Sequence, residues 1–94
     1  MPRYARGGHY VYTLRLQGGR RYVGSTSNIN QRLNKHFSGR GSQWTQRYHP
    51  VAVESVQRCR TRESSRAAER IVYRNTSAYH GRSTVRGAGY TRSY

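Results

Sequence analysis

An arginine and a histidine four residues apart are the pair in this sequence whose spacing most suggests chemistry. A helix would place Arg32 and His36 on one face, as a cation beside a group that transfers protons near neutral pH. The simpler interpretation is a solvated basic helix face, the commonest use of such residues. Shortly before this helix, Tyr22 and Gly24 add a phenol and an open backbone near its N-terminal end, where anions bind readily.

The sequence around this pair predicts the end of a strand, a tight loop and a helix over residues 27–37. Thr26 or Ser27 can cap that helix by accepting a backbone N–H bond. An apolar stripe repeats every four residues and lies beside the Arg32–His36 stripe; it comprises Ile29, Leu33 and Phe37.

A hairpin precedes this helix. Residues 9–16 alternate, so that one face of the strand carries Tyr10, Tyr12, Leu14 and Leu16. The pair Gly18-Gly19 predicts a two-residue turn with positive φ, and residues 20–24 form the return strand. Tyr12 and Tyr22 then lie on adjacent antiparallel strands, close enough for their phenols to share one site.

The rest of the chain predicts one short helical turn, one strand and one long helix. The turn opens at Trp44 and stops before Pro50, and residues 51–56 alternate as a third strand. Thr61 can cap a helix over residues 62–75 whose inner face comprises Ala68, Ile71, Val72 and Asn75. We therefore expect an α/β (α+β) fold, a small three-stranded antiparallel sheet flanked by helices. Residues 1–8 form a flexible basic arm, residues 9–90 a single domain and residues 91–94 a basic tail.

Composition favours a polyanionic partner. Lysine and arginine total 18 against three acidic residues, which gives a formal charge of +15, and arginine far outnumbers lysine. Guanidinium groups suit fork-shaped contacts to phosphate, so nucleic acid is the expected partner. A non-specific basic binding protein is the alternative that composition alone favours. The single cysteine excludes an internal disulfide, and no segment could span a membrane.

The acidic residues restrict the possible metal chemistry. The chain has no aspartate, and its only carboxylate side chains are Glu54, Glu63 and Glu69. A nuclease site that clamps two metal ions usually needs several carboxylates converging on one place. If this chain cleaves a phosphodiester, it must use one metal ion on one carboxylate, with tyrosine, histidine and arginine supplying the rest.

These residues together resemble the GIY-YIG nuclease superfamily, in its small stand-alone branch. The two motifs that name the family are matched by Tyr10-Val11-Tyr12 and Tyr22-Val23-Gly24 on neighbouring strands. Further along, Arg32 and His36 match an RxxxH motif followed by an aromatic residue, residues 39–51 are similar to a GxGxxxT…RP segment, and Glu69 matches a single glutamate on a later helix. The resemblance covers residues 9–90. It departs at two places. Tyr10 replaces the first glycine of the family motif, and the closing VRGG segment reads VRGA in this chain.

The resemblance implies a metal-dependent DNA endonuclease. Glu69 would hold one Mg²⁺ or Mn²⁺, mostly through water, and Arg32 would bind the scissile phosphate. Tyr12 would orient the attacking water while His36 relays its proton, Tyr22 would position the same water or the phosphate, and Gly24 would permit close approach. Whether Tyr12 or His36 is the general base stays open. Two alternatives also stay open: Tyr12 and Tyr22 could be core residues, and His36 could contact a phosphate instead of transferring a proton.

DNA is the expected substrate, and we expect an intracellular protein (cytoplasm, or nucleus in a eukaryote) that acts in DNA repair or recombination. The expected DNA contacts, by stacking or phosphate binding with packing as the alternative, are Arg40, Trp44, Arg47 and Tyr48. A strong positive field with little base reading favours a structure- or single-strand-selective enzyme. The competing hypotheses are a catalytically silent binding module and a catalytic subunit that needs a protein partner for targeting.

Overall fold

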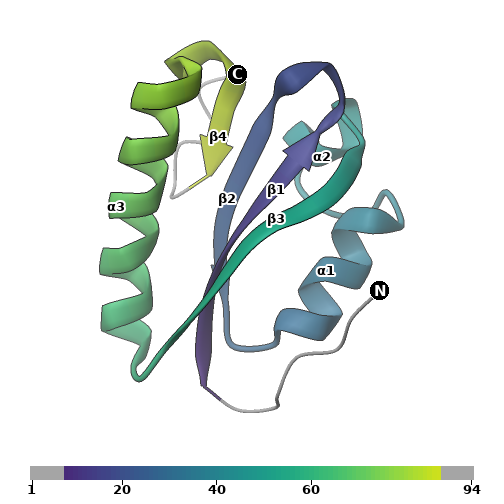
Figure 1. Cartoon of the computed structure of the whole chain (residues 1–94). Coiled ribbons are helices and arrows are strands. Elements are labelled where there is room, and N and C mark those ends of the chain that lie inside the picture. Colours follow the sequence, from purple (N-terminus) through teal and green to yellow (C-terminus); the bar gives the residue numbers. More distant parts are fainter. Residues whose placement is uncertain (1–7, 88–94) are drawn as a thin grey trace.

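Four strands form the sheet of the described chain, residues 8–87 of a computed structural model. In the order β3-β1-β2-β4, the sheet contains β3 (Pro50–Cys59), β1 (His9–Leu16), β2 (Arg21–Thr26) and β4 (Val85–Gly87). Its faces are covered by helices on both sides (Figure 1). This is the mixed α/β class that the sequence predicts. The predicted tail over 91–94 and all but the last residue of the predicted arm over 1–8 lie outside the described residues.

The hairpin between β1 and β2 forms where the two glycines predict it. Gly18 and Gly19 both have φ of 73°, the left-handed conformation that glycine adopts without steric cost. The turn comprises three residues, Gln17–Gly19, one more than predicted, and the Leu16 N–H closes it by donating to the Arg20 carbonyl over 2.8 Å.

The sheet has one strand more than the sequence predicts. β4 pairs with β2 in parallel, which gives a mixed sheet where a purely antiparallel one was expected. Val85 at its start is fully buried. Three residues carry too little alternation to predict a strand, and the partner strand lies about sixty residues earlier in the chain.

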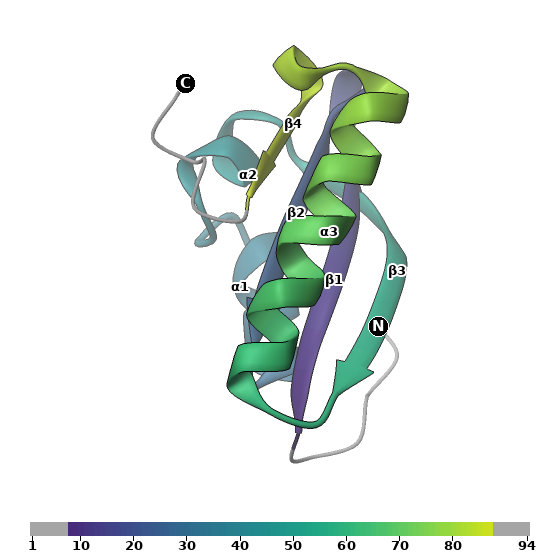
Figure 2. The same cartoon turned by 90° about the vertical axis from the view of Figure 1, so that its left-hand side faces the viewer.

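The helices sandwich the sheet. α1 (Ile29–Phe37) and α2 (Gln43–Arg47) cover one face, and α3 (Arg62–His80) runs along the other (Figures 1 and 2). α1 begins two residues later than predicted because Asn28, and not Thr26 or Ser27, caps it by accepting from the Gln31 N–H over 3.3 Å.

The apolar core is divided between the two faces of the sheet. The α1 and α2 side holds the larger cluster, which comprises Tyr10, Tyr12, Leu14, Leu16, Tyr22, Ile29, Leu33 and Trp44. The α3 side holds a smaller cluster built on Val11, Val23 and Val85. Because both faces are covered, β1 is buried along most of its length, and the predicted shared face of its tyrosines and leucines is confirmed.

α3 differs from the prediction in its length and in its inner face. It continues to His80, five residues past the predicted end, and Gly81 follows it. Ala68 and Val72 pack against the smaller cluster as predicted. Ile71 is 56% exposed and Asn75 is also exposed, so the predicted inward position of each is wrong. The buried residues of α3 are Ser65 and Ser77, so small polar side chains share its inner face with Ala68 and Val72.

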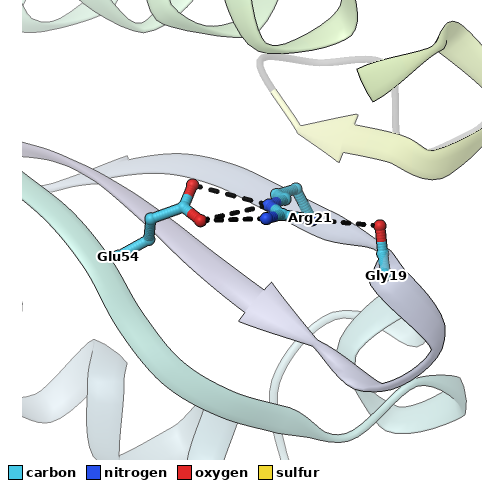
Figure 3. A network of polar contacts seen from close by, with 3 residues as sticks. All are labelled: Gly19, Arg21 and Glu54. Atoms are coloured by element: carbon cyan, nitrogen blue, oxygen red, sulfur yellow. Dashed lines mark hydrogen bonds and ion pairs between the residues drawn. The ribbon is translucent and has the colours of Figure 1, made fainter. Parts of the chain in front are cut away.

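β3 extends beyond the predicted 51–56 and is irregular. Two register shifts against β1 leave Val51 and Glu54 without a direct partner in the pairing. At the second irregularity Glu54 reaches across β1 to Arg21 on β2, with Oε1 3.1 Å from Nη2 and 3.2 Å from Nε (Figure 3). Arg21 also donates to the Gly19 carbonyl over 3.1 Å, so one guanidinium ties the hairpin turn to β3.

Candidate active site

A chain of hydrogen bonds runs from β1 through α1 to α2. The Tyr12 hydroxyl lies 2.9 Å from Nε2 of His36, and Nδ1 of His36 lies 3.0 Å from Oγ1 of Thr45. The Thr45 hydroxyl donates to the Ser42 carbonyl over 3.0 Å. Its oxygen is then left to accept from Nδ1–H, so we infer that Nε2 carries the lone pair and accepts from Tyr12.

Burial keeps both groups of this pair neutral. Tyr12 and His36 are each 1% exposed. Burial, followed by the nearby Tyr22 phenol, raises the pKa of Tyr12, and the Arg32 charge opposes this rise. Burial, with the Arg32 charge adding to it, lowers the pKa of His36 to about 4. At pH 7 the site therefore holds a protonated phenol beside a neutral imidazole.

Tyr22 and Gly24 complete the wall around this pair. The Tyr22 ring centroid lies 6.2 Å from that of Tyr12 and 4.9 Å from that of His36. Gly24 pairs with Tyr12 across the hairpin. A Cβ at residue 24 would lie 2.5 Å from the Tyr12 hydroxyl oxygen and 2.6 Å from Cζ. Glycine is therefore required for Tyr12 to occupy its position against His36.

Glu69 reaches the same region from α3. Its half-buried side chain accepts a hydrogen bond from the Ser25 hydroxyl over 2.8 Å, at the end of β2. The charges of Glu69 and Arg32 both act on the Tyr12 phenol, and Arg32 is exposed on α1. The predicted residues Tyr12, Tyr22, Arg32, His36 and Glu69, from four elements, thus surround one place.

A pocket of about 380 Å³ opens beside this place. It lies between the end of β2 and the first turns of α1 and α3, and its lining includes Ser25, Ser27, Arg32, Arg62, Ser65 and Arg66. Ser25 and Arg32 connect it to the Tyr12 site.

The site suits a metal ion with few protein ligands. Across residues 8–87 no three His, Cys, Asp or Glu side chains gather as a metal cage. Glu69 alone offers a hard carboxylate here. Mg²⁺ is commonly held by one or two carboxylates, with water and phosphate oxygens completing its shell. The donor set therefore fits a single hard ion, with Glu69 as its protein ligand.

Three residues at the site were not singled out from the sequence. Thr45 fixes His36, and Ser25 holds Glu69. Gly41 leaves room for the hydrogen bond between His36 and Thr45, because a Cβ at residue 41 would collide with Nδ1 of His36 and lie 2.7 Å from Oγ1 of Thr45. Gly41 and Thr45 fall in the GxGxxxT segment, which was the available signal. Nothing local marked Ser25.

The residues predicted to contact DNA divide into buried and exposed ones. Trp44 is 4% exposed and its indole N–H donates to the Arg21 carbonyl over 2.9 Å, so its ring packs in the core, which favours the packing alternative over stacking on DNA. Tyr48 is half-buried, with its ring 4.7 Å from that of Trp44. Arg40 and Arg47 are exposed, and their contact with DNA stays a prediction.

Within residues 8–87 no helix combines the length and the apolar character needed to cross a bilayer.

Comparison with known proteins identifies the family. Residues 8–83 match the model of the GIY-YIG catalytic domain. A UPF0213 protein of Bacillus licheniformis is 34% identical over 61 residues, which cover 65% of this chain and 63% of that protein. A UPF0213 protein of Streptococcus pneumoniae serotype 4 is 32% identical over 65 residues, with coverage of 69% and 66%. One from Halalkalibacterium halodurans is 40% identical over 45 residues, with coverage of 48% of each chain.

These matches span about half to two thirds of the relatives' own length, and no solved structure matches. The family match covers most of the chain and includes the paired tyrosines, the Arg32–His36 helix and Glu69. A GIY-YIG catalytic domain is a nuclease-type domain. The chain belongs to the GIY-YIG catalytic domain family.

Proposed function

We propose that this chain is a DNA endonuclease that hydrolyses phosphodiester bonds with one divalent metal ion, Mg²⁺ or Mn²⁺. The observation that supports it best is the buried chain from Tyr12 through His36 to Thr45, with Glu69 nearby. A nucleic-acid-binding module needs neither a buried neutral histidine beside a phenol nor a carboxylate within a basic surface.

Tyr12 is the residue that orients the attacking water in this mechanism. Its hydroxyl hydrogen is directed at Nε2 of His36. The Arg32 side chain donates a hydrogen bond to the phenolic oxygen, whose remaining lone pair is left to accept one from water. As the water attacks phosphorus, its proton moves to the Tyr12 oxygen while the Tyr12 proton moves to Nε2. The buried phenol alone is a poor base, so His36 is the final proton acceptor.

Arg32 binds the scissile phosphate and stabilises the charge that develops on its oxygens. An anionic phosphate there also offsets the guanidinium charge that, after burial, lowers the pKa of His36. Substrate binding thus strengthens His36 as a proton acceptor. Tyr22 positions the water or the phosphate.

Glu69 is the protein ligand for the metal ion, and Ser25 fixes the orientation of its carboxylate. A bound Mg²⁺ or Mn²⁺ would supply charge neutralisation at the leaving 3′-oxygen. Neither of the other two glutamates adds a carboxylate to the site. Glu54 pairs with Arg21, and Glu63 is exposed in the first turn of α3.

In this proposal the enzyme selects its substrate by DNA structure more than by base sequence. A chain of +15 charge binds mainly through phosphates, which carry no sequence information. We expect preference for branched, nicked or single-stranded DNA and action in repair or recombination inside the cell. Targeting by a protein partner is compatible with it.

Cleavage of labelled single-stranded, duplex and branched DNA tests the proposal, with Mg²⁺, Mn²⁺ or EDTA. We expect metal-dependent cutting that Glu69→Ala lowers by roughly 100-fold or more. Glu63→Ala is the matched control, since it removes an exposed carboxylate from the same helix, and it should cut normally. Equal rates for the two variants would contradict the metal-ligand role. Tight binding without cutting of any substrate would favour the silent binding module.

A further inference from the structure

The pocket beside the candidate active site is built for an anion. Three arginines line it, Arg32, Arg62 and Arg66, together with the hydroxyl residues Ser25, Thr26, Ser27 and Ser65, and no carboxylate is among its described lining residues. His9 also lines it. A cavity with several arginines and hydroxyls suits the tetrahedral oxygens of a phosphate and does not suit the flat apolar face of a base.

Backbone dipoles act in the same direction as these side chains. Ser27 lies just before α1, while Arg62 and Arg66 lie in the first two turns of the 19-residue α3. The partial positive charge at a helix N-terminus favours an anion. Two helix starts and three arginines therefore concentrate positive potential at one pocket.

The pocket shares two lining residues with the candidate active site, and its other arginines lie outside that site. Arg32 lines the pocket and acts electrostatically on Tyr12 and His36, while Ser25 lines it and donates to Glu69. Arg62 and Arg66 take no part in the arrangement around Tyr12. A strand whose scissile phosphate lies at Arg32 would place a neighbouring phosphate toward α3.

We propose that this pocket binds a second phosphate of the nucleic-acid strand, next to the scissile one, through Arg62 and Arg66. This inference rests on the proposed function and deepens it. Holding two successive phosphates fixes the direction in which the strand enters, and it aligns the scissile bond with Tyr12. α3 thus contributes a substrate contact in addition to the metal ligand Glu69.

Equilibrium binding in EDTA tests the inference without requiring cleavage. The variant R62A/R66A is compared with R70A/R74A, because all four arginines are exposed on α3 and each variant loses the same charge. We expect R62A/R66A to weaken binding of a fluorescently labelled 12-mer, single-stranded or duplex, by at least about tenfold. Its salt slope on duplex should fall by about 0.9 for each lost phosphate contact. R70A/R74A should change both quantities far less.

The same oligonucleotide with and without a 5′-phosphate distinguishes two sources of the anion. A difference between the variants on both forms indicates an internal phosphodiester, and one confined to the phosphorylated form indicates a terminal phosphate. Equal weakening by the two variants on both forms would overturn the inference, since the pocket would then add nothing to general attraction. Melting temperatures check that both variants are folded.

Failure of the proposed function gives a different result. If the two variants differ in DNA affinity but the protein cuts no DNA with Mg²⁺, the phosphate pocket is supported and the nuclease proposal is refuted. If the protein cuts DNA but the variants R62A/R66A and R70A/R74A bind DNA with equal affinity, the nuclease proposal is supported and the phosphate pocket is refuted.

Discussion

At the scale of single residues, the site depends on how both nitrogens of one histidine are used. His36 faces Tyr12 with Nε2 and Thr45 with Nδ1, so neither nitrogen faces solvent. A direct phosphate contact, one of the alternatives left open by the sequence, would require one of these bonds to break. The arrangement instead suits a histidine that exchanges a proton with Tyr12.

The lowered pKa of His36 predicts that stability depends on pH. The pKa is about 4 in the folded chain and 6.5 in a model peptide, so between these values the unfolded chain binds more protons. Stability should be constant above pH 6.5 and fall by up to about 3 kcal/mol as pH decreases toward 4. Urea unfolding at pH 7.5, 6.0 and 5.0 measures this change. In His36→Gln the dependence over this interval should be much weaker; an equal dependence would contradict it.

Removal of the Thr45 hydroxyl should impair activity more than folding. Thr45→Val keeps the shape but leaves Nδ1–H buried without an acceptor, which costs about 1–3 kcal/mol. The imidazole can escape this cost by moving its proton to Nε2, where it no longer accepts from Tyr12. We therefore expect kcat to fall by roughly tenfold to a hundredfold with little change in KM. Thr45→Ser retains the hydroxyl and should stay near the wild-type rate.

At the scale of elements, the sequence predicts what is local and periodic. The alternation of Tyr10 to Leu16 and the glycine pair after it define the hairpin, because a period of two and positive φ are properties of a few adjacent residues. Nothing local distinguishes the buried His36 from the exposed Arg32, since burial depends on α2 and β1 packing around it. The outward turn of Ile71 likewise depends on how α3 docks.

β4 escaped prediction for the same reason, and a substitution tests its place in the sheet. Val85 is fully buried against the α3 side of the sheet, so Val85→Ala should lower the free energy of unfolding by about 2 kcal/mol. Val51→Ala is the matched control, because Val51 is 53% exposed, and should change it by less than about 0.5 kcal/mol. Chemical denaturation compares the two. Equal effects would place β4 outside the core.

At the scale of the whole molecule, a formal charge of +15 on 94 residues opposes folding. Eighteen basic side chains face three acidic ones, and one of those three, Glu54, forms an ion pair with Arg21. The excess positive charge, which favours a polyanionic partner, repels itself when no polyanion is present. The composition predicts this directly from the sequence, without any knowledge of the fold.

This repulsion predicts that salt stabilises the free protein. Raising NaCl from about 20 to 300 mM shortens the screening length, so the melting temperature should rise. A gain of 1 kcal/mol corresponds to about 4–8 °C in a domain of this size. Thermal unfolding followed by circular dichroism measures the change. A melting temperature that falls with salt would show that specific ion pairs outweigh the general repulsion.

The irregular course of β3 has a consequence for how copies of this chain meet. β3 forms one outer edge of the sheet, and an edge with free N–H and C=O groups is a template on which another strand can add. The two register shifts at Val51 and Glu54 interrupt its regular spacing, and Arg58 places a charge along it. At the opposite edge, the part of β4 within residues 8–87 pairs with β2 over three residues. The β3 edge is thus a poor template for another strand, so it resists edge-to-edge aggregation even in conditions where salt screens the charge of the chain.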